Sequence, residues 1–241
     1  MKNQFNILNC DNYKVIDHTH TLSPENPGYL EDDTIKIIPN KDTTSNDIIE
    51  FKIILSEHFG THIDAPIHFG EKNSIAINQI PPENLVGPVV VIDVRNKVEK
   101  DSDYELSLND INNWEKMHGY IPDNAIVIMF SGWQDRWNKP DFYRNKHDNT
   151  YHFPGFSLSA TNWMLNNRNI NGIGIDTLSV DNGLSKNFFV HQTLFNAQKW
   201  CVENLCNLEK IPPIGGFMVV GPIKHEGGSG GPARIYTILP C

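Results

Sequence analysis

Four short and nearly continuous apolar segments constrain the fold of this chain most strongly. They lie at residues 89–94, 125–130, 172–176 and 216–220. Apolar runs of this length, without alternating polar residues, are typical of strands that are buried on both faces of a sheet. Residues 234–239 are expected to add a last strand, and a plain loop into it is favoured for the glycine-dense residues 227–234, the alternative being a tight turn that brings backbone or Arg234 near a site. The sequence therefore favours a sheet that is covered on both sides.

Helical patterns lie between these strands. Ser107 opens a sequence that resembles a capping box, apolar residues follow at helical spacing, and Gly119 is expected to end this helix. A second helix is expected to begin after Ser159 and end near residue 167, and a third apolar helical pattern runs over residues 193–205. Strands that alternate with helices indicate the α/β class.

Polar residues recur at even-numbered positions within residues 58–69, which read HFGTHIDAPIHF. The groups capable of metal or proton chemistry all fall on even positions: His58, His62, Asp64 and His68. The odd positions are almost all apolar, and an extended backbone sends alternate side chains to opposite faces. While the chain stays extended, one face would carry these four groups and the other would face the core. Pro66 is expected to end regular pairing before His68.

Neutral imidazoles and an ionised carboxylate form a ligand set for a divalent cation. Three such ligands leave coordination positions for water, whose pKa a bound ion lowers to about 7. His68 would then be a further ligand or a general acid and base. The alternative is a strand whose histidine-rich face is solvated. The metal site is favoured over this alternative, because the three histidines and the aspartate would lie on one face of the strand, opposite an apolar face.

The same segment resembles the H-x-G-T-H-x-D-x-P-x-H signature of the metal-dependent cyclase family, which includes bacterial kynurenine formamidases and isatin hydrolases. Residues 174–181, which read GIDTLSVD, and the following Ser185 and Lys186 resemble a second stretch of that family. The resemblance runs from about residue 15 to residue 238. It implies a swivelling β/β/α-type fold with a mixed sheet and flanking helices. The length of 241 residues, without an internal repeat or a composition break, predicts a single domain over residues 1–241. The resemblance also implies a homodimer or a higher homo-oligomer.

The resemblance further implies which residues form the site. By the formamidase pattern, His58, His62 and Asp64 hold one metal, Asp64 reaches a second metal with His191 and Glu203, and His68 is the catalytic acid and base. In one straight helix, His191 and Glu203 would lie about 18 Å apart, so the resemblance requires the chain to bend or the helix to end between them. Isatin hydrolases are similar too, but they use a single manganese and have an amide side chain where Glu203 aligns. One or two divalent ions are therefore expected, with Glu203 favouring two, and with zinc ahead of manganese.

The activity that the resemblance implies is hydrolysis of an amide bond in an aromatic or cyclic small molecule. We expect an arylformamidase that converts N-formylkynurenine to kynurenine and formate, with isatin-hydrolase-like opening of a cyclic amide or lactone as the alternative. Formamidases usually carry a tryptophan in the segment that reads PENPGY here, at residues 24–29, and this difference bears on the substrate. A metal-binding scaffold or sensor without turnover is the competing class, and the presence of His68 opposes it.

Composition narrows the partners and the compartment. A formal charge of −9 disfavours binding to nucleic acid or to anionic membranes, and no apolar run reaches the roughly 18 residues of a membrane span. The cysteines at positions 10, 201, 206 and 241 form no CxxC pair and fit free thiols. Because residues 1–10 also lack the apolar core of a signal peptide, a cytoplasmic location is expected. The aromatic residues of segment 133–153 are expected to line a pocket, to pack on a partner subunit, or to pack on the core.

Overall fold

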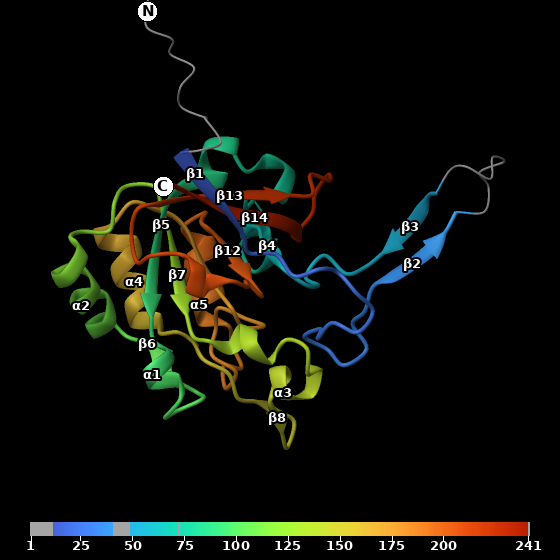
Figure 1. Cartoon of the computed structure of the whole chain (residues 1–241), viewed down its shortest axis with the longest axis horizontal. Coiled ribbons are helices and arrows are strands. Elements are labelled where there is room, and N and C mark those ends of the chain that lie inside the picture. Colours follow the sequence, from blue (N-terminus) through green and yellow to red (C-terminus); the bar gives the residue numbers. More distant parts are fainter. Residues whose placement is uncertain (1–11, 41–48, 72, 241) are drawn as a thin grey trace, which may run out of the picture.

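The computed structural model describes residues 12–40, 49–71 and 73–240 (Figure 1). The expectations for residues 1–10, including Cys10, and for Cys241 fall outside these ranges. Within them, no helix has the length and apolar character needed to cross a membrane. The α/β class is confirmed, and the assignment of residues 1–241 to a single domain stays a prediction.

One mixed sheet of eight strands organises the described chain, in the order β1-β14-β13-β5-β7-β11-β12-β4. Strand β14 also pairs with β4, so all of these strands except β1 form a closed, barrel-like ring. The four strands from β5 to β12 are mutually parallel, and the other pairs are antiparallel. The bounds are β1 (Tyr13–Asp17), β4 (His62–Asp64), β5 (Val86–Asp93), β7 (Ala125–Phe130), β11 (Ile170–Ile175), β12 (Trp200–Glu203), β13 (Gly216–Pro222) and β14 (Gly230–Pro240).

The predicted two-sided burial is confirmed for β7 and β11, all of whose residues are buried, and for residues 89–92 of β5, but it is wrong for β13, where buried and more exposed residues alternate and Phe217 is 44% exposed. All six residues of β7 are buried, and they alternate between two clusters of the core. Ala125, Val127 and Met129 pack with residues of the helices, whereas Ile126, Ile128 and Phe130 pack with residues from the other strands. A strand that is apolar on both faces can pack in this way only where something covers each face. The first cluster therefore lies between the sheet and the helices, and the second fills the closed ring.

Two of the three predicted helices are confirmed. Ser107 caps α2 (Leu108–His118) by accepting a hydrogen bond from the Asp110 backbone, and Gly119, at φ 91°, ends this helix. Helix α4 (Leu158–Asn167) is capped by Ser157, two residues before the predicted start. The other helices are α1 (Arg95–Val98), α3 (Pro140–Arg144) and α5 (Phe189–Asn196), and short 3-10 turns include Pro66–His68, Ile77–Gln79, Pro82–Leu85, Trp133–Arg136 and Leu208–Lys210.

The single helix predicted over residues 193–205 is wrong. Helix α5 ends at Asn196, and after a turn the chain enters β12. Residues 200–202 of β12 pair in parallel with β11, and residues 201–203 pair antiparallel with β4. All four residues of β12 are buried. The apolar residues in this half of the segment therefore belong to a central strand. The break meets the requirement that a helix end between His191 and Glu203.

The strand predicted over residues 58–69 is much shorter than expected. Only His62–Asp64 form β4. Gly60 adopts φ 70°, so the chain turns before the strand, and Pro66 begins a 3-10 turn that ends pairing before His68, as predicted. His58 and His68 therefore flank the strand instead of lying in it.

Two peripheral features complete the fold. A hairpin of β2 (Lys36–Pro39) and β3 (Phe51–Ile54) projects away from the body (Figure 1). Segment 133–153 contains α3 and the short pair β8 (Lys146–His147) and β9 (Thr150–Tyr151), and β6 (Glu105–Leu106) pairs with β10 (Gly155–Phe156). Four rings of that segment are buried in the core: Trp133, Trp137, Tyr143 and Phe153. These four rings pack on the core, one of the three roles considered, whereas Phe142 is 52% exposed and the packing on a partner subunit stays a prediction.

Candidate metal centre and substrate pocket

The site is built where β4, β12 and α5 meet. In the antiparallel pair of β4 and β12, His62 lies opposite Glu203 and Asp64 lies opposite Cys201. Ile63 and Val202, the residues between them, point into the closed ring. Because side chains alternate along a strand, the four paired residues point to the other face. His191 reaches the same face from the first turn of α5.

His62 is held in an orientation that suits a metal ligand. Its Nδ1 donates a hydrogen bond to the Gly60 carbonyl at 2.9 Å. Its Nε2 faces Asp64 Oδ1 at 3.1 Å and Glu203 Oε2 at 3.4 Å, yet this buried atom makes no hydrogen bond to the described residues. Buried polar atoms normally have a partner. Histidines that bind metals commonly donate their other ring N–H to a carbonyl or a carboxylate, as His62 does here.

His191 has the same arrangement with a carboxylate as its support. Its Nδ1 lies 2.6 Å from Asp181 Oδ2, and its Nε2 lies 3.2 Å from Asp64 Oδ2 and 3.1 Å from Glu203 Oε1. Asp181 also accepts hydrogen bonds from the backbone amides of Val190 and His191, both at 3.0 Å. This carboxylate therefore fixes both the start of α5 and the His191 ring.

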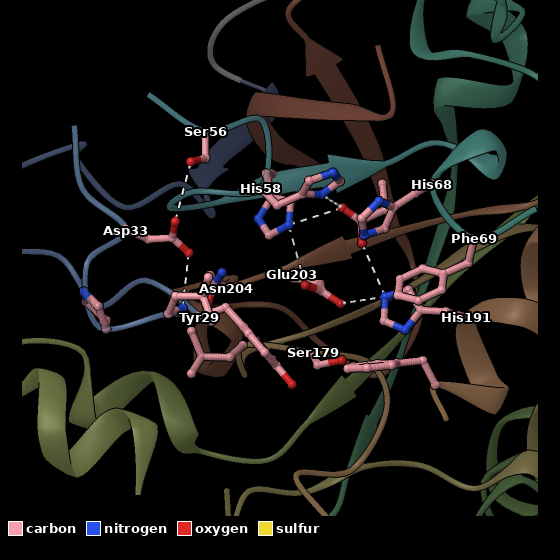
Figure 2. A pocket seen from close by; sticks show the side chains of 16 residues that line it. Tyr29, Asp33, Ser56, His58, His68, Phe69, Ser179, His191, Glu203 and Asn204 are labelled. Atoms are coloured by element: carbon pink, nitrogen blue, oxygen red, sulfur yellow. Dashed lines mark hydrogen bonds and ion pairs between the residues drawn. The ribbon is translucent and has the colours of Figure 1, made fainter. Parts of the chain in front are cut away.

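Asp64 lies at the centre of two overlapping groups. One group is His58, His62 and Asp64, and the other is Asp64, His191, Cys201 and Glu203, with potential ligand atoms in each lying within 4.8 Å of one another. Asp64 presents Oδ1 to the first group and Oδ2 to the second. All members are buried except His58, which is partly exposed. Figure 2 shows how His58, His191 and Glu203 converge. A buried cluster of imidazoles, carboxylates and a thiol suits a divalent cation.

The charges in the cluster also favour a bound cation. Burial alone would raise the pKa of Asp64, but the neighbouring His58 and His62 hold it well below its usual range. Burial opposes a charge on His62, yet the carboxylates of Asp64 and Glu203 outweigh it and raise the pKa of His62 to about 9. Without a metal, the carboxylates therefore favour protons on the His62 and His191 imidazoles, whose pKa values both lie above the ordinary value. Ligand imidazoles must be neutral, so a bound divalent ion would replace those protons.

The remaining predicted residue, His68, lies beside the cluster. Its ring stacks on His58 with 3.8 Å between centroids, and burial lowers the pKa of His68 to about 4. His68 is therefore neutral near pH 7. The structure thus brings together all six residues that were predicted for the site: His58, His62, Asp64, His68, His191 and Glu203.

A cavity of about 320 Å³ opens onto this cluster. His68 and the cluster line one part of it, and Asp33 and Ser56 lie at a distance from them (Figure 2). The remaining lining is mainly apolar: Pro27, Tyr29, Leu30, Phe69, Leu178 and Phe188. A concave, largely apolar site with a few convergent polar groups is typical of small-molecule binding, and the rings of Tyr29, Phe69 and Phe188 suit an aromatic ligand.

Several residues that shape the site were not assigned from the sequence. Asp181 belongs to the GIDTLSVD stretch, which was the one available signal. Ser229 Oγ lies 2.9 Å from His58 Nε2, and a Cβ on Gly230 would lie 2.5 Å from His58 Cε1. The plain loop predicted over residues 227–234 is therefore wrong: β14 already begins at Gly230 and pairs with β4, and the backbone of this segment leaves room for the His58 ring. Cys201 joins the second group through the pairing of β12 with β4.

Comparisons with known proteins identify the family of this chain and several relatives. The family model described as "Putative cyclase" matches residues 16–182. An isatin hydrolase from Roseibium aggregatum is 30% identical over 195 residues, covering 78% of this chain and 74% of the relative. A kynurenine formamidase from Salinibacter ruber is 25% identical over 226 residues, covering 91% and 95%. The solved structure of isatin hydrolase A from Ralstonia solanacearum matches with a TM-score of 0.87 and 31% identity, covering 94% of this chain and 92% of that chain.

Proposed function

Because the chain belongs to the cyclase family of metal-dependent hydrolases, we propose that it hydrolyses an amide bond of an aromatic or cyclic small molecule at the cluster around Asp64. The observation that carries this proposal is the place of the cluster, which is buried at the base of an apolar cavity of about 320 Å³. The polar groups of such a site fix the reacting bond, while the aromatic walls hold the body of the substrate. A scaffold without turnover would need no such cavity.

We propose that two divalent ions share Asp64. His58 and His62 would hold the first ion with Asp64, and His191 and Glu203 would hold the second with Asp64. The support is that each carboxylate presents different oxygens to the two groups, with Glu203 Oε2 near His62 and Oε1 near His191. Zinc is proposed ahead of manganese. A divalent ion in such a site supplies water that is acidic enough to react near neutral pH.

The proposed role of His68 is to move protons during the reaction. Its neutral imidazole lines the cavity beside His58. It can therefore accept a proton from the attacking water and then deliver a proton to the leaving nitrogen. Asp181 and the Gly60 carbonyl hold the rings of His191 and His62 in the tautomers that leave Nε2 free.

Two substrates fit this class, and each has a specific observation in its favour. Opening of a fused cyclic amide such as isatin is supported by the similarity to isatin hydrolases. It is also supported by the absence of tryptophan from residues 24–29, where Pro27 and Tyr29 line the cavity. Hydrolysis of N-formylkynurenine is supported by Glu203, a carboxylate that contacts both groups of the cluster.

We also propose that the protein forms a homodimer or a larger homo-oligomer. The hairpin of β2 and β3 exposes apolar side chains at 43–58% of their surface: Ile37, Ile38, Phe51, Ile53 and Ile54. An exposed apolar patch of this kind commonly marks a protein interface. Analytical ultracentrifugation of the wild type and of an Ile38→Lys, Ile53→Lys double variant tests this proposal. A wild type that sediments as a monomer would refute it.

The test of the reaction is the rate of hydrolysis of isatin and of N-formylkynurenine by the purified protein. Each rate is measured before chelation, after chelation, and after zinc or manganese is added back. We expect turnover of at least one substrate that chelation abolishes and metal restores, while circular dichroism shows that the chelated protein remains folded. No turnover of either amide by protein with measured bound metal would refute the proposal.

A further inference from the structure

Cys201 lies within the cluster, but the function proposed above gives its thiol no role. It is fully buried in β12, directly opposite Asp64 in the pairing with β4. Its Sγ lies 3.7 Å from Asp64 Oδ2. Glu203 lies two residues further along the same strand, so both side chains point to the same face. The thiol therefore lies among the proposed ligands of the second ion.

Three separations between atoms of this group are close to those of a tetrahedral site that contains sulfur. In zinc sites, nitrogen and oxygen ligands bind at about 2.0–2.1 Å and sulfur at about 2.3 Å, which places two N/O ligand atoms about 3.3 Å apart and a sulfur about 3.5 Å from an oxygen. In this chain, His191 Nε2 lies 3.2 Å from Asp64 Oδ2 and 3.1 Å from Glu203 Oε1. The separation of sulfur and oxygen is 3.7 Å. All three distances are within about 0.2 Å of the tetrahedral values.

We propose that Cys201 is a ligand of the second ion, which it binds through sulfur together with Asp64, His191 and Glu203. This inference rests on the proposed two-ion function. Coordination breaks the S–H bond, releases its proton to solvent and forms a bond from the sulfur to the ion. Thiolate ligands select zinc over harder ions such as manganese. Cys201 would thus set the metal preference of this group.

The proposal also gives the two groups different coordination. Four protein ligands close a tetrahedral site, whereas three leave a position for water. The group of Asp64, His191, Cys201 and Glu203 would be closed. The open positions then belong to the group of His58, His62 and Asp64, next to His68. The competing interpretation is that Cys201 is a small core residue whose S–H donates a weak hydrogen bond to Asp64.

Cobalt(II) distinguishes these interpretations, because a thiolate bound to cobalt gives a charge-transfer absorption band in the near ultraviolet. The full chain is stripped of metal, loaded with cobalt, and compared with Cys201→Ser and Cys206→Ser variants. Cys206 is the other described cysteine, and it is buried near Asn207, outside the cluster. We expect the band in the wild type and in Cys206→Ser, and its loss in Cys201→Ser. A variant with Ser at positions 10, 206 and 241 should keep the band.

Competition between zinc and manganese gives a second readout. Loss of the sulfur ligand should shift the ratio of bound zinc to bound manganese at least about tenfold toward manganese, since even the loss of groups that only support a ligand lowers metal affinity about 10–100-fold. Wild-type protein that binds cobalt without the band would overturn the role of Cys201 and leave the proposed hydrolase intact, even if Cys201→Ser failed to fold. Wild-type protein that binds no cobalt at all would overturn both.

Discussion

Replacing Asp181 with Asn tests whether metal binding depends on the hydrogen bond that orients the His191 ring, and not only on the presence of His191. In the wild type, Asp181 accepts hydrogen bonds on both oxygens: His191 Nδ1 and the His191 amide on Oδ2, and the Val190 amide and Ser185 Oγ on Oδ1. An amide keeps only one acceptor oxygen. Its NH2 group must therefore face an N–H donor on one side or the other.

The size of the effect follows from these contacts. If the NH2 group faces His191, the ring can accept this hydrogen bond only by moving its proton to Nε2, which removes the free nitrogen from the ion. If it faces Val190, the ring keeps its tautomer but loses the carboxylate that raises its basicity. Either arrangement should weaken zinc binding about 10–100-fold, which corresponds to about 1.4–2.7 kcal/mol.

The assay is competition for zinc against a chromophoric chelator at constant pH. Asp103→Asn is the matched control, because Asp103 forms the same kind of pair with His152, at 2.8 Å, and does not line the cavity. That variant should bind zinc as the wild type does. Asp181→Asn protein that is folded and has unchanged zinc affinity would refute the role given to Asp181, as would an equal loss in Asp103→Asn.

Three further changes test other parts of the account. His68→Ala should lower kcat about 100–10,000-fold with unchanged metal content by elemental analysis; loss of the metal would instead make His68 a ligand. Gly230→Ala should displace His58, 2.5 Å from the new Cβ, and lower turnover about a hundredfold, while Gly221→Ala, with its nearest atom at 3.3 Å, should remain active. His20 stacks on Trp137 with 3.9 Å between centroids, and burial lowers its pKa to about 4. This pKa is below the value of about 6.5 in the unfolded chain, so protonation of His20 favours unfolding. The contribution of neutral His20 to the free energy of unfolding is fully present above pH 6.5. It should fall by up to about 3 kcal/mol as the pH approaches 4. Urea unfolding across this range should show a weaker pH dependence in His20→Phe, and equal slopes in the two proteins would contradict the assignment.

The sheet could be predicted where the sequence signal is local. The apolar runs of β5, β7 and β11 are continuous because both faces of the sheet are covered there. The similar run of β13 has one partly exposed face, with Phe217 44% exposed, which its sequence does not reveal. Ser107 identifies the start of α2 by its own hydrogen bond. Residues 193–205 were misassigned because a helix followed by a buried strand leaves an apolar pattern that resembles a longer helix. The closure of the ring by β14 and β4 joins segments that are distant in the chain, and no local pattern reveals such a pairing.

Like the sheet, the site could be predicted where its residues lie close together in the sequence. His58, His62, Asp64 and His68 lie in one short segment, so their spacing shows that they belong together. His191 and Glu203 came from the family resemblance, because their proximity depends on the break between α5 and β12. The contacts of Cys201 with Asp64 and of Ser229 with His58 span 137 and 171 residues. These contacts follow from the pairing of strands, which the sequence alone did not provide.

The most direct test of the central claim is to measure bound metal and amide hydrolysis on the same samples of wild-type and Asp64→Ala protein. Asp64 is the one residue that belongs to both groups of the cluster. We expect chelator-sensitive hydrolysis and bound divalent metal in the wild type, and neither in folded Asp64→Ala protein. Asp64→Ala protein that keeps its metal and its turnover would contradict that claim.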